Sequence, residues 1–127
     1  MSHTVEIKTE IKNLGCLKKA FEHFGWTIKD HSKMRTYGSD PLREAVYDHV
    51  AVNPRGSFDI GIRRQENDYK LFGDTFDRSI EQQLGSNFGL LKQRYSFETI
   101  KEYAEESELE YEVTTLPNGT LELVIQE

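Results

Sequence analysis

Two alternating segments in the middle of the chain, joined by a short polar connection, place the strongest constraint on the fold. Phe58, Ile60 and Ile62 alternate with polar residues or glycine, and this period of two is typical of a strand with one buried face. Residues 65–68 have the composition of a hairpin connection, and residues 69–73 return as a second strand. We therefore predict a β-hairpin at the centre of an antiparallel sheet.

The segments before this hairpin carry one helix pattern and three strand patterns. Residues 4–11 alternate as an opening strand, and a second strand begins at residues 26–28. Between them, apolar residues recur at helical spacing after Asn13, a good N-cap, and the pattern stops at Gly25. Residues 45–52 are mostly β-branched or apolar at both odd and even positions, which indicates a strand covered on both faces, or nearly so.

After the central hairpin the pattern changes to helices. A short helix is predicted over residues 77–84, and a glycine-containing break follows it. A second amphipathic helix comes next, either capped at Ser96 or continuous with the residues before it. The predicted inner residues of this helix are Phe97, Ile100, Tyr103 and Ala104, and the outer ones are Glu98, Glu102, Glu105 and Glu106.

The last segment predicts a second hairpin. Residues 111–115 and 121–125 both alternate, and Asn118 and Gly119 lie between them. Asn-Gly favours a type I′ turn, because both central residues need a positive φ. A strand pair is therefore expected at the end of the sequence.

Together these patterns predict the α+β class for a single domain over residues 1–127. The expected architecture is one antiparallel sheet of about five to six strands with two main helices on one face, compatible with a ferredoxin-like layout. In this arrangement residues 58–62 and 121–125 share one layer, which buries Phe21 and Ile100 beneath it.

Composition fits a small globular protein. A length of 127 residues suits one domain, and the 36% of hydrophobic residues are spread in periodic segments that can form a core. No apolar run approaches the ~20 residues of a membrane span, and the N-terminus lacks a signal-peptide pattern. Cys16 is the only cysteine, so no internal disulfide can form. We expect a soluble, cytoplasmic protein without membrane contact.

The net charge of −6 is unevenly distributed along the sequence. Residues 1–70 hold 12 Lys and Arg against 10 Asp and Glu, whereas residues 71–127 hold 4 against 12. Binding to duplex DNA is not expected, since neutralising phosphates supplies most of the affinity of such proteins. The acidic half is interpreted as a solvated face, and any anionic ligand is expected to bind the first half.

Recognised catalytic and metal-binding motifs are absent from the sequence. The four histidines have no metal-motif spacing, and Cys16 lies beside the apolar stripe of the first helix, as a buried thiol would. Asp74 and Asp77 could share a face as an acid–base pair, although helix capping explains them better. Gly61 lies in no phosphate-binding motif and indicates a bulge or a close backbone approach. The sequence predicts no metal, no cofactor and no catalytic residue.

Four short segments, in order along the chain, resemble a known family. Residues 1–14, 58–62, 93–95 and 118–126 are similar to the hypothetical chloroplast open reading frame thirty-five family, and the match covers nearly the whole chain. The family comprises small plastid and cyanobacterial proteins, with bacterial and viral relatives. The resemblance implies a fold, but it implies no established activity, cofactor or catalytic residue.

The sequence departs from the plastid members in two regions and at its end. The regions are residues 29–43 and 73–88, and the tryptophan-bearing tail of plastid relatives is missing. A bacterial or phage source therefore fits as well as a plastid one. The resemblance also places His3 at the first strand of the sheet.

One stretch of the sequence is rich in side chains that suit ligand binding. Arginine offers forked donors for phosphate or carboxylate, and tyrosine offers a stacking face. If the second strand lies near the central hairpin, Lys33, Arg35 and Arg63 converge on one sheet face. Ordinary surface charge is the alternative interpretation, since acidic residues dilute this patch. The predicted ligand-binding residues are Lys33, Arg35, Tyr37, Arg63, Arg64 and His3, with Arg43 and Arg55 nearby in sequence.

Three function hypotheses remain open from the sequence. The first is a non-catalytic binding or accessory protein that acts through protein contacts or through an anionic small ligand such as a nucleotide. The second is RNA or single-strand binding on the sheet face, with Tyr37 and Tyr69 as stacking platforms. The third is an enzyme that uses His3 or the Asp74 and Asp77 pair. Exposed sheet edges also permit a homo-oligomer.

Overall fold

A five-stranded antiparallel sheet forms the base of the fold. The computed structural model describes residues 4–38, 40–74, 77–115, 117 and 121–126. Within the sheet the strand order is β1-β5-β4-β3-β2, and every neighbouring pair is antiparallel. The strands are β1 (Thr4–Ile11), β2 (Thr27–Lys33), β3 (Val46–Val52), β4 (Ile60–Gln65) and β5 (Asp68–Asp74). The central hairpin predicted from the sequence is therefore confirmed as β4 and β5.

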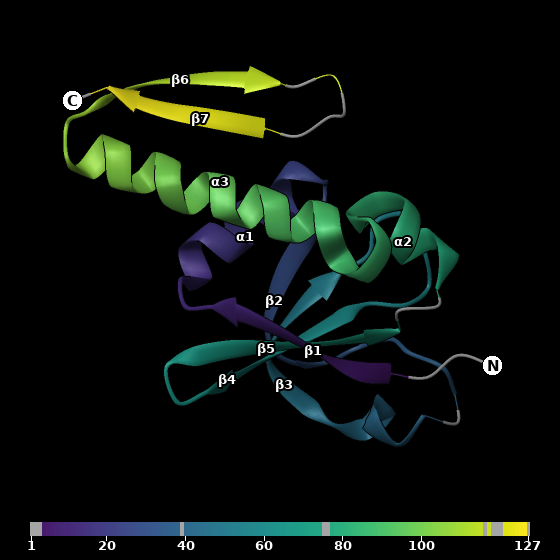
Figure 1. Cartoon of the computed structure of the whole chain (residues 1–127). Coiled ribbons are helices and arrows are strands. Elements are labelled where there is room, and N and C mark those ends of the chain that lie inside the picture. Colours follow the sequence, from purple (N-terminus) through teal and green to yellow (C-terminus); the bar gives the residue numbers. More distant parts are fainter. Residues whose placement is uncertain (1–3, 39, 75–76, 116, 118–120, 127) are drawn as a thin grey trace.

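Helices cover one face of this sheet (Figure 1). They are α1 (Leu14–His23), α2 (Arg78–Leu84) and α3 (Gly89–Glu106), with the 3-10 turn η2 (Ser86–Phe88) between α2 and α3. A second 3-10 turn, η1 (Pro41–Glu44), lies on the opposite face, where Leu42 packs beside Met34 and Tyr47. The predicted α+β class, with an antiparallel sheet and helices on one face, is confirmed. β1 and β2 lie at the two opposite edges of the sheet and run in the same direction, with three strands between them. In a split βαβ unit, by contrast, one strand lies between the two parallel strands.

Local sequence signals account for the helix boundaries. Asn13 caps α1, because its Oδ1 accepts a hydrogen bond from the Cys16 backbone N–H at 3.0 Å. Gly25 ends the helix with a φ of +85°, a conformation that glycine adopts without strain. The Asp77 carboxylate caps α2 by accepting from the Ile80 backbone N–H at 3.0 Å, so capping accounts for this acid.

The main hydrophobic core lies between the sheet and the helices. Burying these side chains supplies about 1.5–3 kcal/mol for each large aliphatic or aromatic residue. Phe21 is fully buried in this core, as predicted. The buried core residues are Ile11, Leu17, Ala20, Phe21, Trp26, Ala51, Ile60, Ile62, Leu71, Ile80, Leu84, Phe88 and Leu91.

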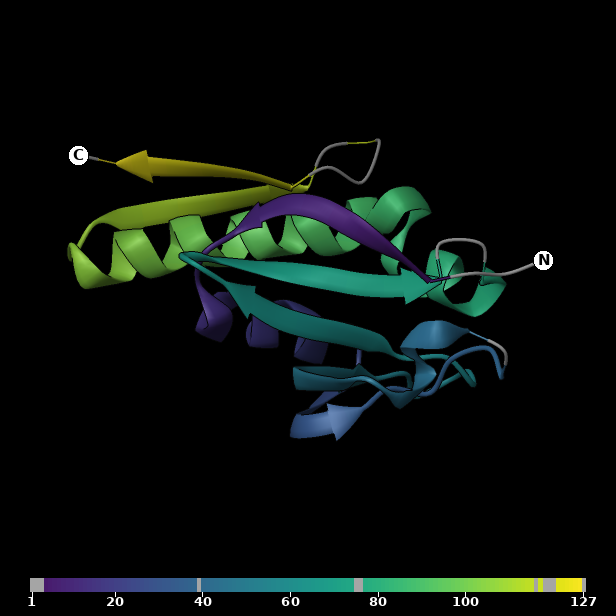
Figure 2. The ribbon, with the colours of Figure 1, turned by 90° about the horizontal axis from the view of Figure 1, so that it is seen from below.

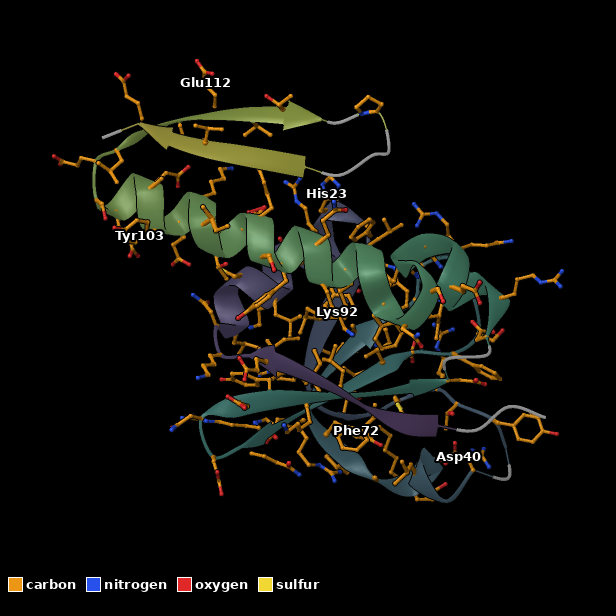
Figure 3. All side chains as sticks on the ribbon, in the orientation of Figure 1. His23, Asp40, Phe72, Lys92, Tyr103 and Glu112 are labelled. Carbon is orange, nitrogen blue, oxygen red and sulfur yellow. The ribbon has the colours of Figure 1, made fainter. Side chains whose placement is uncertain are left out.

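A smaller cluster lies on the opposite face of the sheet and explains the sequence of β3. Val50 belongs to this outer cluster with Met34 and Tyr47, whereas its neighbour Ala51 belongs to the main core. The prediction that residues 45–52 form a strand covered on both faces, or nearly so, is confirmed at Tyr47, Val50 and Ala51, whereas Val46 at the start of the strand is 57% exposed. Figure 3 shows Phe72, which packs on this cluster, on the side of the sheet away from the helices.

Gly61 permits the outer cluster to pack closely on β4. A Cβ atom built at Gly61 would lie 2.6–2.8 Å from the Tyr47 ring, a separation that real Cβ atoms essentially never show. The close backbone approach predicted at this glycine is confirmed. The ring of Tyr47 therefore lies directly on the β4 backbone.

The C-terminal hairpin forms a separate two-stranded sheet. β6 (Glu110–Thr115) and β7 (Leu121–Gln126) pair only with each other among the described residues. Figures 1 and 2 both show this hairpin beside α3, on the side away from α1. The expectation that residues 58–62 and 121–125 share one layer is wrong, because α3 lies between the two sheets. The predicted Asn118–Gly119 turn lies outside the described residues.

The inward face of α3 also differs from the prediction. Ile100 is 42% exposed and Tyr103 is 57% exposed, whereas the predicted outer residue Glu98 is 7% exposed. The Glu98 carboxylate pairs with Arg94 of the same helix, and Arg94 Nη2 donates a hydrogen bond to Glu98 Oε1 at 3.1 Å. A polar partner thus stabilises a carboxylate on the buried side of α3, although hydrophobic periodicity places Glu98 on the outer side.

Candidate functional site

A surface hollow of about 360 Å³ lies where the end of β2 faces η1. We call it the β2–η1 hollow. Lys33 ends β2, Arg35 follows two residues later, and Arg43 comes from η1. The residues that line the hollow are Lys33, Met34, Arg35, Thr36, Arg43 and Glu44. Two residues of the predicted ligand-binding set, Lys33 and Arg35, are therefore brought together.

Arg35 is held in place by a buried carboxylate at the start of β4. Its Nη2 lies 2.7 Å from Asp59 Oδ1, and its Nε lies 3.0 Å from Oδ2. The Asp59 side chain is 4% exposed, whereas the Arg35 side chain is 50% exposed. These bonds to Asp59 raise the pKa of Arg35. One edge of the guanidinium therefore binds the protein while half of the side chain remains open to solvent.

Backbone groups complete the coordination of Asp59. Its carboxylate accepts from the backbone N–H groups of Arg35 and Asn53, each at 2.9 Å. The Asp59 N–H donates to the Arg35 carbonyl at 2.8 Å, and Arg35 Nη2 donates to the Asn53 carbonyl at 2.9 Å. Burying a carboxylate is costly unless it is paired and hydrogen-bonded, and these bonds meet that requirement.

Asp59 is the residue of this site that the sequence did not reveal. In the alternating pattern it takes the position of an outward-facing residue on β4. It is nevertheless 3% exposed, because the segment that follows β2 covers this face. No sequence signal identifies its role, since the partner lies 24 positions away.

The polar contacts continue from Asn53 to the helix layer. The Asn53 side chain accepts from Gln83 Nε2 at 2.8 Å and donates to Ser79 Oγ at 3.2 Å. Gln83 Oε1 in turn accepts from Trp26 Nε1 and from Arg55 Nη1, both at 2.9 Å. Arg55, which belongs to the basic stretch in the sequence, is thus engaged in joining the loop to α2.

Lys33 has a weaker partner than Arg35. Its Nζ lies 2.7 Å from Glu44 Oε2, and both side chains are more than half exposed. The bond from Lys33 lowers the pKa of Glu44. Ion pairs between exposed side chains are weak, so Lys33 can exchange Glu44 for another anion at small cost. Arg43 is also exposed at the rim of the hollow.

The other predicted ligand-binding residues do not line the hollow. Arg63 packs over the outer cluster, with its Cζ 4.8 Å from the centre of the Tyr47 ring and 5.4 Å from that of Phe72. Arg64 lies near the end of β4 and is exposed, and Tyr37 is 43% exposed. His3 lies outside the described residues.

Cys16 is buried between α1 and α3. Its Sγ donates to Glu102 Oε2 at 2.7 Å, and the same oxygen accepts from Asn13 Nδ2 at 2.9 Å. Burial and this bond raise the pKa of Cys16 to about 12, so the thiol stays protonated near neutral pH. The prediction of a buried thiol is confirmed.

The described part of the chain offers neither a metal site nor a membrane-spanning helix. No group of three or more His, Cys, Asp or Glu side chains is arranged there to hold a metal ion. Asp74 is buried, and Asp77 caps α2. No helix among the described residues is long and apolar enough to cross a membrane.

Comparison with known proteins gives one relative over the whole length. The chain is 29% identical over 133 aligned residues to a protein of Cyanophora paradoxa named "Uncharacterized protein ycf35". The alignment covers 99% of this chain and 97% of that protein. No family model matches the chain, and no solved structure matches it.

Proposed function

We propose that this chain, which is similar over nearly its whole length to a protein named "Uncharacterized protein ycf35", is a non-catalytic binding protein that holds a small phosphate-bearing ligand. The proposed site is the β2–η1 hollow. The observation that carries the proposal is that Lys33, Arg35 and Arg43, from two separate segments, line this one hollow.

Arg35 is suited to the role because its orientation is fixed before a ligand arrives. Asp59 and the Asn53 carbonyl hold one edge of its guanidinium. The remaining N–H groups are free to meet an anion without a further loss of side-chain freedom. Pre-organised donors of this kind suit phosphate oxygens, which accept forked hydrogen bonds.

The charge of the hollow is compatible with an anion of more than one negative charge. Three cations line it, against Glu44 at the rim and the buried Asp59 behind Arg35. Lys33 can turn from Glu44 to the ligand, since their exposed pair is weak. A di- or triphosphate offers enough acceptors for all three cations, and a nucleotide is the ligand that we propose.

Thermal melting in the presence of pyrophosphate and of adenosine triphosphate tests this proposal. A ligand at about 100 times its Kd stabilises the folded state by about 2.7 kcal/mol, so the melting temperature should rise for the native chain. Arg43→Ala should remove this rise while leaving the ligand-free melting temperature unchanged. The matched control is Arg64→Ala, which removes an exposed arginine that does not line the hollow.

The expected outcome is stabilisation by both phosphates in the native chain and in Arg64→Ala, and none in Arg43→Ala. Adenosine, which lacks phosphate, should have no comparable effect. Equal stabilisation of all three chains would show that the hollow is not the site. No stabilisation by either phosphate compound would overturn the proposed function.

A further inference from the structure

The second half of α3 and the C-terminal hairpin form a strongly acidic part of the molecule, here called the acidic arm. Residues 98–127 contain nine glutamates and one lysine, a net charge of −8. The rest of the chain therefore carries +2 of the total of −6. Glu105, Glu106, Glu108, Glu110 and Glu112 are all exposed. The negative charge of the protein is thus concentrated on the arm.

The acidic arm also exposes apolar side chains. Ile100 is 42% exposed, Tyr103 57%, Val113 45% and Val124 44%. Val124 is the cross-strand partner of Glu112 and shares its face of the hairpin, whereas Val113 lies on the other face. Val113 is therefore the exposed apolar side chain of β6 that a partner strand could contact.

The hairpin leaves strand edges unpaired. Among the described residues, β6 and β7 each have one strand neighbour, which is the other strand of the hairpin. Unpaired strand edges bind extended chains through backbone hydrogen bonds. A two-stranded ribbon is marginal by itself, so an added strand would also stabilise it.

The side chains of β6 alternate in a way that specifies the added strand. Glu110 and Glu112 point to one face of the ribbon, and Tyr111 and Val113 point to the other, because successive strand residues alternate. Figure 3 shows Glu112 pointing away from α3. A strand pairing with β6 would place its own alternating residues beside these two sets.

Charge decides between classes of partner. Nucleic acids and anionic lipid surfaces are polyanions, which a surface carrying −8 repels. We propose that the acidic arm binds a protein partner through an extended segment of alternating basic and apolar residues, which pairs with the free edge of β6. The basic side chains meet Glu110 and Glu112, and the apolar ones pack beside Val113. This proposal is independent of ligand binding in the β2–η1 hollow.

Titration of the isotope-labelled full chain with a synthetic peptide of alternating lysine and valine tests this inference. We expect amide shifts concentrated on β6, and an affinity that falls as salt is added. The double variant Glu110→Lys, Glu112→Lys should weaken binding by roughly tenfold or more, the ratio given by about 1.4 kcal/mol. Val113→Thr keeps a strand-forming residue and should also weaken binding.

Matched controls separate this site from general charge attraction. Glu66→Lys changes an exposed glutamate on the turn between β4 and β5 and should leave the affinity unchanged. A peptide of alternating glutamate and valine, a short oligouridylate, and a second copy of the chain tested by sedimentation should not bind the arm. Shifts spread over all acidic residues, equal weakening by Glu66→Lys, binding by any of these alternatives, or no binding of the basic peptide would overturn the inference.

Discussion

The guanidinium of Arg35 and the carboxylate of Asp59 form a forked ion pair, with Nη2 and Nε at 2.7 and 3.0 Å from the two carboxylate oxygens. The pair joins the segment after β2 to the start of β4 across the outer side of the sheet. Because Asp59 is buried and Arg35 is half exposed, the pair has a structural side and a solvent side. Arg35 therefore contributes to the stability of the fold, whereas Arg43 is exposed at the rim of the hollow.

Replacing Arg35 by alanine should lower the stability of the fold. Asp59 would keep two backbone donors but lose its charged partner, and we expect a cost of about 2–3 kcal/mol. Urea unfolding followed by circular dichroism measures this difference. Arg64→Ala, at an exposed position, should change stability by less than about 0.5 kcal/mol. Equal stability of the Arg35 and Arg64 variants would contradict the structural role of the pair.

Two glycine substitutions should act in opposite directions. Gly61→Ala places a methyl group against the Tyr47 ring, and overpacking of this kind costs about 1–3 kcal/mol. Gly89 lies at the start of α3 with helical dihedral angles, and no atom lies within 4 Å of a Cβ atom built there. Gly89→Ala should therefore stabilise the fold by up to about 1 kcal/mol. A neutral Gly61→Ala would mean that Tyr47 does not lie on the β4 backbone.

Cys16 should make the fold sensitive to alkaline pH. Its pKa rises from 9.0 to about 12 in the folded chain. Above about pH 9 the unfolded thiol loses its proton while the folded one keeps it, so stability falls as pH rises through this window. The difference in unfolding free energy between native protein and Cys16→Ser isolates the effect. A pH-independent difference up to pH 12 would contradict the raised pKa.

His23 should titrate below the ordinary range of histidine. Desolvation at its position, followed by the nearby charge of Arg94, lowers the pKa of His23. As pH falls below the unfolded pKa, the unfolded state takes up the proton first, so this group reduces stability on acidification. Proton NMR of the imidazole measures the midpoint. Arg94→Gln should raise the midpoint and Arg78→Gln on α2 should not; a midpoint at about 6.5 or above would refute the assignment.

Most of the fold was predictable from local pattern. The central hairpin, the limits of α1 and the double burial of residues 45–52 follow from alternation, capping residues and apolar parity. These signals act within a few residues along the chain, and the fold does not override them. The single long helix α3 was one of two alternatives that the sequence left open.

The placement of the terminal hairpin was not predictable in the same way. Alternation in residues 121–125 identifies a strand but says nothing about which sheet it joins. The intervening α3 separates this hairpin from β4. The face of α3 was also misassigned, because Glu98 and Glu102 find polar partners on their inner side that hydrophobic periodicity cannot register.

The candidate site was predictable in part. Lys33 and Arg35 stand out as cations near the end of one strand, and both line the hollow. Arg63 was expected to join them, but its guanidinium stacks on Tyr47 instead. Asp59 was missed because its role depends on its ion pair with Arg35, 24 positions away. Such a pairing between distant segments cannot be recognised in a single sequence.

Phosphate binding in the hollow is tested most directly by a map of backbone amide shifts during titration of the native chain with pyrophosphate. We expect shifts confined to residues 33–36, 43 and 44, which line the β2–η1 hollow, and the same titration of Arg43→Ala should give none. Shifts centred on Arg63 and Arg64, or no shifts at any residue of the hollow, would contradict the claim that this surface binds a phosphate-bearing ligand.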